Sequence, residues 1–260
     1  MKQLRADANP TKHFFIENFT RDLSLEDVVL DLIDNSIDSL MRHENIKITS
    51  EMLLNGNGKE DRDRRWIEIN ISKEQFSILD NCGGISTELA EKEVFRFGKL
   101  SVEHKSSLGV YGIGMKRAMF KIGKKIEVQS RTKDSGFQVS IDVEDWLKDE
   151  NNWTFPMKII GQAKTKQDRG TKINIRELNE SIGIRISDPT FINKLSKSIA
   201  TTYSLFLGRY VDLILNDKEI HPTQIPITKS EEVTPAVQKE HTIALNWNLL
   251  LGFLIVRMGG

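Results

Sequence analysis

The stretch "LIDNSIDSL" occupies residues 32–40 and lies in the most apolar helical segment near the N-terminus. It carries Asp34, Asn35 and Asp38, and Asp31 stands just before it. Carboxylates and amides are costly to bury without partners. These side chains therefore either form a solvated outer face or line a functional site.

A helical wheel narrows the choice. We expect a helix over residues 24–42, with Ser24 as N-cap and acidic residues in the first turn, where the helix dipole favours them. At 100° per residue, one narrow polar stripe contains Asp31, Asn35, Asp38 and Arg42. An amphipathic helix with a wet acidic face is the ordinary interpretation. The wide apolar arc beside the stripe favours a lined site instead, because a neutral Asn oxygen next to a carboxylate suits Mg²⁺ and a bound water.

Composition sets broad limits. The chain has 260 residues, with 37 basic and 37 acidic side chains, so net charge gives no general case for nucleic acid or an anionic membrane. One cysteine, Cys82, excludes an internal disulfide framework and suits a cytoplasmic location. The polar start predicts no signal peptide, and the longest apolar run, 249–256, is too short to span a bilayer.

The remaining pattern mixes helices and strands, which predicts an α/β or α+β protein. Strands are expected at 66–72, 76–80, 125–132, 137–143, 157–161, 170–175 and 211–222, the last with a tight turn, and helices at 86–97, 115–123 and 188–208.

A second motif is "ILDNCGGIS", residues 78–86, where a strand ends in Asp80 before a glycine pair. Most such strings are simple turns. A buried Asp before Gly83 and Gly84 can instead accept a hydrogen bond from an exocyclic amine such as that of adenine, with glycine leaving room for the ring.

Two further motifs are weak alone. In "GVYGIGMKRAMFKIG", residues 109–123, a glycine-rich turn leads into a helix N-terminus, which can bind phosphate. It lacks the preceding strand of a dinucleotide fingerprint, and no GxxxxGK[ST] loop occurs. "RGTKINI", residues 169–175, places Gly170 and Thr171 at the start of a strand.

The order of these four motifs resembles the GHKL superfamily, which contains gyrase-type topoisomerases, heat-shock chaperones, histidine kinases, MutL and the MORC proteins. "FGKLS" and "LGVYGIGMKRA" look closest to the MORC and chaperone branches. The resemblance covers roughly residues 14–220. It implies an α+β protein with the Bergerat ATP-binding fold, a two-layer sandwich with a mixed, mostly antiparallel sheet.

The resemblance also implies roles for single residues. Asp31 is the water-activating acid, Asn35 is the Mg²⁺ ligand, and Asp80 binds adenine, with Thr171 supporting it through water. Further nucleotide-binding positions are Asp38, Gly84, Ile85, Lys99, Gly112, Gly114, Met115 and Lys116, with Lys99 coming from a lid over residues 98–114. The family usually has Glu in place of Asp31 and Gly in place of Cys82.

We therefore expect an ATPase that uses ATP and Mg²⁺, closes its lid and forms a nucleotide-dependent homodimer. One alternative is a nucleotide-sensing module with little turnover, which the short Asp31 favours. A histidine kinase is a second, disfavoured by the acid at position 31 and by the few residues before Ser24. DNA is a partner by family analogy only. Residues 1–220 are expected to form the ATP-binding domain, and residues 221–260 a strand segment that can begin a further domain.

Overall fold

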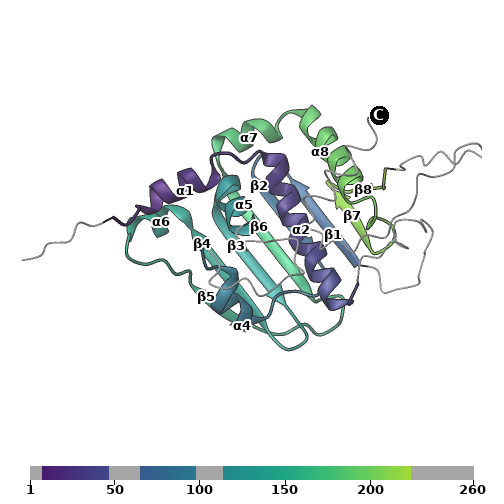
Figure 1. Ribbon diagram of the computed structural model, residues 1–260, viewed down its shortest axis with the longest axis horizontal. Coiled ribbons are helices and arrows are strands. Elements are labelled where there is room, and N and C mark those ends of the chain that lie inside the picture. The colour runs from purple at the N-terminus through teal and green to yellow at the C-terminus, as the bar shows by residue number, and fades with distance from the viewer. Residues whose placement is uncertain (1–7, 47–64, 98–113, 224–260) are drawn as a thin grey trace, which may run out of the picture.

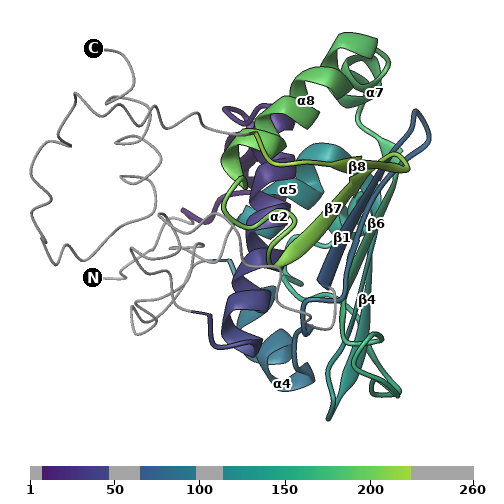
Figure 2. The same cartoon turned by 90° about the vertical axis from the view of Figure 1, so that its right-hand side faces the viewer.

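The computed structural model describes residues 8–46, 65–97 and 114–223. They form one sheet with the order β5-β4-β3-β6-β2-β1-β7-β8 and helices on one of its faces (Figures 1 and 2). The strands are β1 Arg65–Ile71, β2 Gln75–Asp80, β3 Gly123–Arg131, β4 Gly136–Asp142, β5 Met157–Ile160, β6 Gly170–Leu178, β7 Val211–Leu215 and β8 Lys218–Ile220. The helices are α1 Lys12–Thr20, α2 Leu25–His43, α4 Thr87–Leu89, the π-helix η1 Ala90–Val94, α5 Gly114–Ile122, α6 Val143–Lys148, α7 Glu180–Ile186 and α8 Pro189–Thr202.

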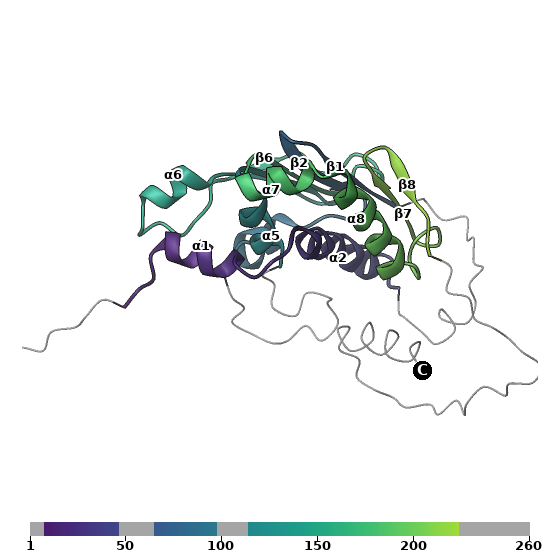
Figure 3. The ribbon, with the colours of Figure 1, turned by 90° about the horizontal axis from the view of Figure 1, so that it is seen from above.

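Strand pairing makes the sheet mixed. All neighbouring strands run antiparallel except β1 and β7, which pair in parallel. Helices α2, α5 and α8 lie side by side on one face (Figure 3), and no helix of the described segments covers the other face (Figure 2). The predicted two-layer sandwich with a mostly antiparallel sheet is thus confirmed.

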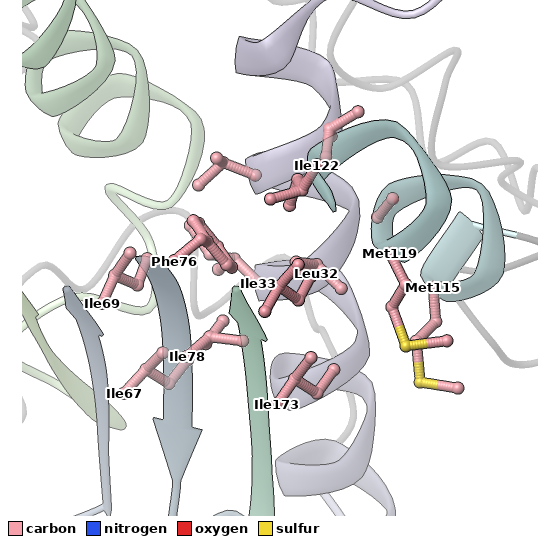
Figure 4. Packing of buried hydrophobic residues seen from close by; sticks show 14 of the residues in the cluster. Leu32, Ile33, Ile67, Ile69, Phe76, Ile78, Met115, Met119, Ile122 and Ile173 are labelled. Carbon is pink, nitrogen blue, oxygen red and sulfur yellow. The ribbon is translucent and has the colours of Figure 1, made fainter. Parts of the chain in front are cut away.

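The core lies between the sheet and the helices (Figure 4). Leu32 and Ile33 of α2 point between the sheet and α5, and both are almost fully buried. Strand side chains such as Ile67 and Ile78 meet them from below, and Met119 of α5 from the side. Each such side chain contributes about 1.5–3 kcal/mol when it is fully buried, so the apolar arc of α2 fixes that helix on the sheet.

Local signals explain where α2 begins. Ser24 accepts a hydrogen bond from Asp27 N, and the Asp27 carboxylate accepts one from Ser24 N, which completes a capping box. The predicted helix start is therefore confirmed. The predicted tight turn at the end of β7 is present too, because Asn216 and Asp217 both have positive φ, as a two-residue hairpin of type I′ requires.

Two helix predictions need correction. The expected helix 86–97 is a short α4 followed by a π-helix that ends at Val94, whose carbonyl oxygen accepts a hydrogen bond from Lys116 Nζ. The expected helix 188–208 begins as predicted at Asp188 but ends at Thr202. Beyond it the chain turns to bury Phe206 and Leu207 and to enter β7.

Helices α1, α6 and α7 were not predicted. Helix α6 begins where the strand pattern 137–143 was expected to end, because Asp142 accepts a hydrogen bond from Asp145 N and caps it. The sheet reaches Ile220, at the predicted domain boundary. The predicted strand segment 221–260 lies almost wholly outside the described residues, so the boundary stays a prediction.

Candidate nucleotide site

The polar stripe of α2 contains the first group of predicted residues. Asn35 is exposed, Asp31 is half-buried and Asp38 is buried. Asn35 Nδ2 donates to the Asp31 carbonyl oxygen at 2.7 Å, one turn earlier. This bond fixes the amide, so Asn35 Oδ1 remains the acceptor that faces away from the helix backbone.

Asp31 lies against the start of α5. A Cβ atom added at Gly114 would lie 3.3 Å from Asp31 Oδ2, so the helix N-terminus approaches this carboxylate closely. Burial raises the pKa of Asp31, the positive charge of Arg117 opposes that shift, and Asp27 adds to it. Arg117 itself is held by α1, because its Nε donates to the Phe19 carbonyl oxygen at 2.8 Å. Asp31 is therefore a carboxylate whose proton affinity is raised, as suits a base.

Asp34, the remaining acid of the motif, faces α8 instead of the stripe. Tyr203 OH lies 2.7 Å from Asp34 Oδ1 and 3.0 Å from the Leu30 carbonyl oxygen. Burial raises the pKa of Asp34 to about 6, and the Tyr203 hydrogen bond opposes that shift. Asp34 thus joins two helices on the turn of α2 that also carries Asp31.

Asp80 ends β2 beneath α2 and is almost fully buried. Its Oδ1 accepts from Cys82 N at 2.8 Å and from Thr171 N at 3.3 Å, and its Oδ2 accepts from Ser36 Oγ at 2.9 Å. Burial raises the pKa of Asp80 to about 6, and these three donors limit the shift. A carboxylate has about four acceptor positions, so one on Oδ2 is left over.

Strand register places Asp80 in a transverse row of the sheet. The helix-covered positions in this row are Leu213 and Ile67 on one side and Phe137 on the other, all fully buried. Between them stand three polar side chains on the adjacent strands β2, β6 and β3, namely Asp80, Thr171 and Ser130. We call these three residues the polar row. Polar groups in the middle of an apolar row are costly to bury, which points to a function.

Ser130 ties the polar row to the glycine turn. Ser130 Oγ accepts from Ile85 N at 2.8 Å, donates to the Gly170 carbonyl oxygen at 3.0 Å, and lies 2.9 Å from Thr171 Oγ1. Thr171 and Ile85, both predicted to contact the nucleotide, are therefore held by one buried serine.

The glycine pair is required by packing within the protein. Gly83 and Gly84 both have positive φ. A Cβ at Gly83 would lie 2.0 Å from the His43 ring, and one at Gly84 would lie 2.2 Å from the Arg131 carbonyl oxygen. The space at these glycines is thus filled by a histidine ring and a neighbouring strand.

The other predicted residues are placed as follows. Met115 is buried at the edge of the core beside Met119 (Figure 4). Lys116 is fully buried, and its Nζ donates to the Val94 carbonyl oxygen at 2.7 Å, which joins α5 to η1. Lys99 and Gly112 lie outside the described residues, as does the predicted lid apart from Gly114.

The described segments also show no metal cluster and no membrane-spanning helix. They contain no group of three or more His, Cys, Asp or Glu side chains that could hold a metal ion. None of their helices combines the length and the apolar character needed to cross a lipid bilayer.

A comparison with protein families decides the assignment. The family described as histidine kinase-, DNA gyrase B- and HSP90-like ATPase matches residues 23–171, which is more than half of the chain. The chain belongs to this ATPase family. The matched segment contains Asp31, Asn35, Asp80 and Thr171, whereas Tyr203 lies beyond it. No curated protein sequence matches the chain.

Membership confirms the predicted superfamily and supports ATP binding, because ATPases of this type bind ATP with Mg²⁺ in general. Sequence reasoning missed two residues of the site, namely Ser36, which donates to Asp80, and Ser130, which contacts Thr171. Ser36 follows Asn35 directly and falls on the apolar arc of the helix, about 100° from the nearest residue of the polar stripe. Ser130 continues the apolar alternation of Ile126 and Val128, and only the strand register shows that it stands beside Thr171.

Proposed function

We propose that this ATPase-family protein binds Mg²⁺–ATP between α2 and the polar row, hydrolyses it slowly, and uses the cycle as a conformational switch. The observation that carries this proposal is Asp80, a buried carboxylate with three donors and one remaining acceptor position. A purely structural aspartate gains nothing from an unused acceptor in a buried place.

The adenine end of the proposal follows from hydrogen-bond chemistry. Asp80 Oδ2 offers its remaining lone pair to the exocyclic amine of adenine, while Thr171 stands beside it in the polar row. The bound carboxylate must be ionised, because a protonated Asp80 has a donor where the amine needs an acceptor. Ile85, held by Ser130, and Met115 supply apolar surface for the base.

The metal end is assigned to Asn35. Its amide is turned by the Nδ2 bond to Asp31, so Oδ1 is exposed and has no partner within the described residues. Mg²⁺ commonly takes one or two protein oxygens together with water and substrate phosphates, which fits a single amide oxygen. When bound, Mg²⁺ neutralises phosphate charge and polarises the terminal phosphoryl group.

Asp31 is assigned the role of base. It stands one turn before Asn35 on the same stripe and against the N-terminus of α5. Its carboxylate accepts a proton from, or orients, a water that attacks the terminal phosphate. Aspartate is one methylene shorter than the glutamate usual in the family, and the close approach of α2 and α5 at Gly114 supports a compensating placement.

The switch rests on family membership and on sequence alone. We assign residues 98–114 as the lid, with Lys99 and the amides near Gly112 and Gly114 on the phosphates, and we propose that closure drives association of two copies. The similarity of "FGKLS" to the MORC and chaperone branches supports the same kind of cycle. A DNA partner has family analogy as its only support.

A nucleotide sensor with little turnover is the second candidate, because Asp31 replaces the usual glutamate. The deciding experiment is ATP binding by calorimetry and phosphate release by the purified protein, each with and without Mg²⁺. Binding with Mg²⁺-dependent turnover supports the ATPase, and binding without turnover supports the sensor. Absence of ATP binding would overturn both.

A further inference from the structure

Resting on the proposed ATP site, we infer that Ser130 is a specificity-determining positioning residue that makes Thr171 a pure acceptor and thereby selects a 6-amino purine. Ser130 contacts two residues assigned to the base, Ile85 and Thr171, and only the Thr171 hydroxyl turns a hydrogen-bonding group toward it.

The direction of each hydrogen bond around Ser130 is fixed by its partners. A serine hydroxyl has one hydrogen and two lone pairs. The Gly170 carbonyl oxygen can only accept, so the Ser130 hydrogen points to it. Ile85 N can only donate, so it occupies one Ser130 lone pair.

The contact with Thr171 then has one solution. Ser130 has a single lone pair left, so Thr171 Oγ1 must donate its hydrogen across the 2.9 Å separation. This is the one assignment in which all three short contacts are hydrogen bonds. Ser130 is 1% exposed, which gives its hydroxyl no water to exchange with and makes the assignment firm.

Thr171 consequently turns only lone pairs toward the base. Its backbone N is already used on Asp80 Oδ1, and Asp80 Oδ2 is itself an acceptor. The edge therefore presents two neighbouring acceptors and no donor. A water that donates both hydrogens to this pair would likewise have only lone pairs for the base.

Such an edge distinguishes two closely related bases. Adenine carries an amine at position 6 and offers two N–H donors. Hypoxanthine carries a carbonyl there and its donor at the neighbouring N1–H. With position 6 facing Asp80 and Thr171, the carbonyl would place a third acceptor against them. A site built to pair one polar group rejects an analogue that lacks it far more strongly than a size difference would.

The experiment compares ATP with inosine triphosphate by calorimetry, with Mg²⁺ and at pH 8, where Asp80 is ionised. Wild type should prefer ATP by about a hundredfold. In Ser130→Ala the Thr171 hydroxyl is released and can donate to a carbonyl, so inosine triphosphate should bind about tenfold tighter relative to ATP. General damage to the site would weaken both nucleotides and leave the ratio unchanged.

Matched variants keep the test decisive. Ser140→Ala removes an exposed serine on the opposite face of β4 and should leave the ratio unchanged. If Ser130→Ala does not fold, Thr171→Val should lower the ratio about tenfold by weakening ATP, and Thr171→Ser should preserve it. An unchanged ratio in folded Ser130→Ala, or in Thr171→Val, overturns the inference while leaving ATP binding intact. A wild type that binds no ATP overturns the proposed function instead.

Discussion

The α2 stripe and the polar row both place polar side chains at the edge of one core, yet they treat those side chains differently. On α2, Asn35 is exposed, and Asp31 is half-buried with its carboxylate beside the start of α5. In the polar row, Asp80 and Ser130 are buried and nearly saturated with hydrogen bonds.

The difference separates two tasks. A buried acceptor with only one position left open is held in place before a ligand arrives, so it suits recognition of a fixed chemical group. Half-exposed oxygens can meet water and a hydrated ion, so they suit the reaction. Damage to the stripe should therefore impair turnover, and damage to the polar row should impair binding.

The largest expected effect is the fall in ATP turnover when Asp31 of the α2 stripe is changed. Asp31→Asn removes the proton acceptor but keeps the size of the side chain, so kcat should fall by about 10²- to 10⁴-fold while ATP affinity stays nearly unchanged. Steady-state phosphate release and calorimetry measure the two quantities. The variant should also accumulate as the closed dimer, which light scattering would detect.

Asp31→Glu is the matched control, because it restores the length usual in the family and should keep or raise the rate. Wild-type turnover in Asp31→Asn would show that the base is elsewhere. It would also contradict the proposal that the α2 stripe serves turnover and the polar row serves binding.

The next largest effect is the loss of ATP affinity when Asp80 of the polar row is changed. Asp80→Ala removes a buried partner of a specific hydrogen bond, which costs about 1–3 kcal/mol and more for a charged group, so ATP should bind at least about tenfold more weakly. Asp80→Asn is the closer control, because its Oδ1 can keep the bonds from Cys82 N and Thr171 N. Both variants should remain folded by circular dichroism. Unchanged affinity in either one would exclude Asp80 from the site.

The sequence predicted the stripe better than the row, for a physical reason. A helix repeats every 3.6 residues, so the positions of Asp31, Asn35 and Asp38 can be computed from one segment. The capping box at Ser24 and Asp27 fixed where that helix begins. Strands β1 and β2 were likewise found from their alternation.

The polar row depends on register between strands far apart in the chain. Ser130 and Thr171 are opposed only because β3 pairs with β6, and nothing local in either strand states this. The same limit explains the helix that was expected to reach Gly208. Its apolar pattern continues past Thr202, but Phe206 and Leu207 are buried through a turn instead.

A third effect is the pH dependence of ATP affinity, which we expect to come from Asp80 of the polar row. The pKa of Asp80 is raised to about 6, so the ionised form needed by the amine is lost as pH falls through 6. ATP affinity should be constant above about pH 7 and fall about tenfold per pH unit well below 6. Protonation of the phosphates of ATP also affects binding in this range. In Asp80→Asn only the phosphates of ATP titrate in this range, so the difference between the pH profiles of wild type and this variant isolates Asp80. Parallel profiles would contradict the assignment.

The smallest effect on nucleotide binding should come from Tyr203, which braces α2 from α8 and touches neither end of the site. Tyr203→Phe removes the hydroxyl that donates to the Asp34–Leu30 turn, so the free energy of unfolding should fall by about 1 kcal/mol while ATP affinity changes less than about twofold. The loss should depend on pH. The pKa of Asp34 is raised to about 6, so this group favours the folded state in its protonated form, and its contribution declines as pH rises from about 4 through 6.

Without the hydroxyl, the half-buried Asp34 carboxylate loses its side-chain donor, so its pKa should rise further. Urea denaturation should therefore show a larger difference between wild type and Tyr203→Phe at pH 8, where Asp34 is ionised, than at pH 5. Tyr210→Phe is the control, because the Tyr210 hydroxyl makes no hydrogen bond within the described segments, and its effect should be small at both pH values. Equal losses at pH 5 and pH 8 would mean that Tyr203 stabilises α2 by packing alone. An ATP affinity that fell with the stability would mean that the turn bearing Asp31 and the polar row act as one unit, contrary to the division proposed here.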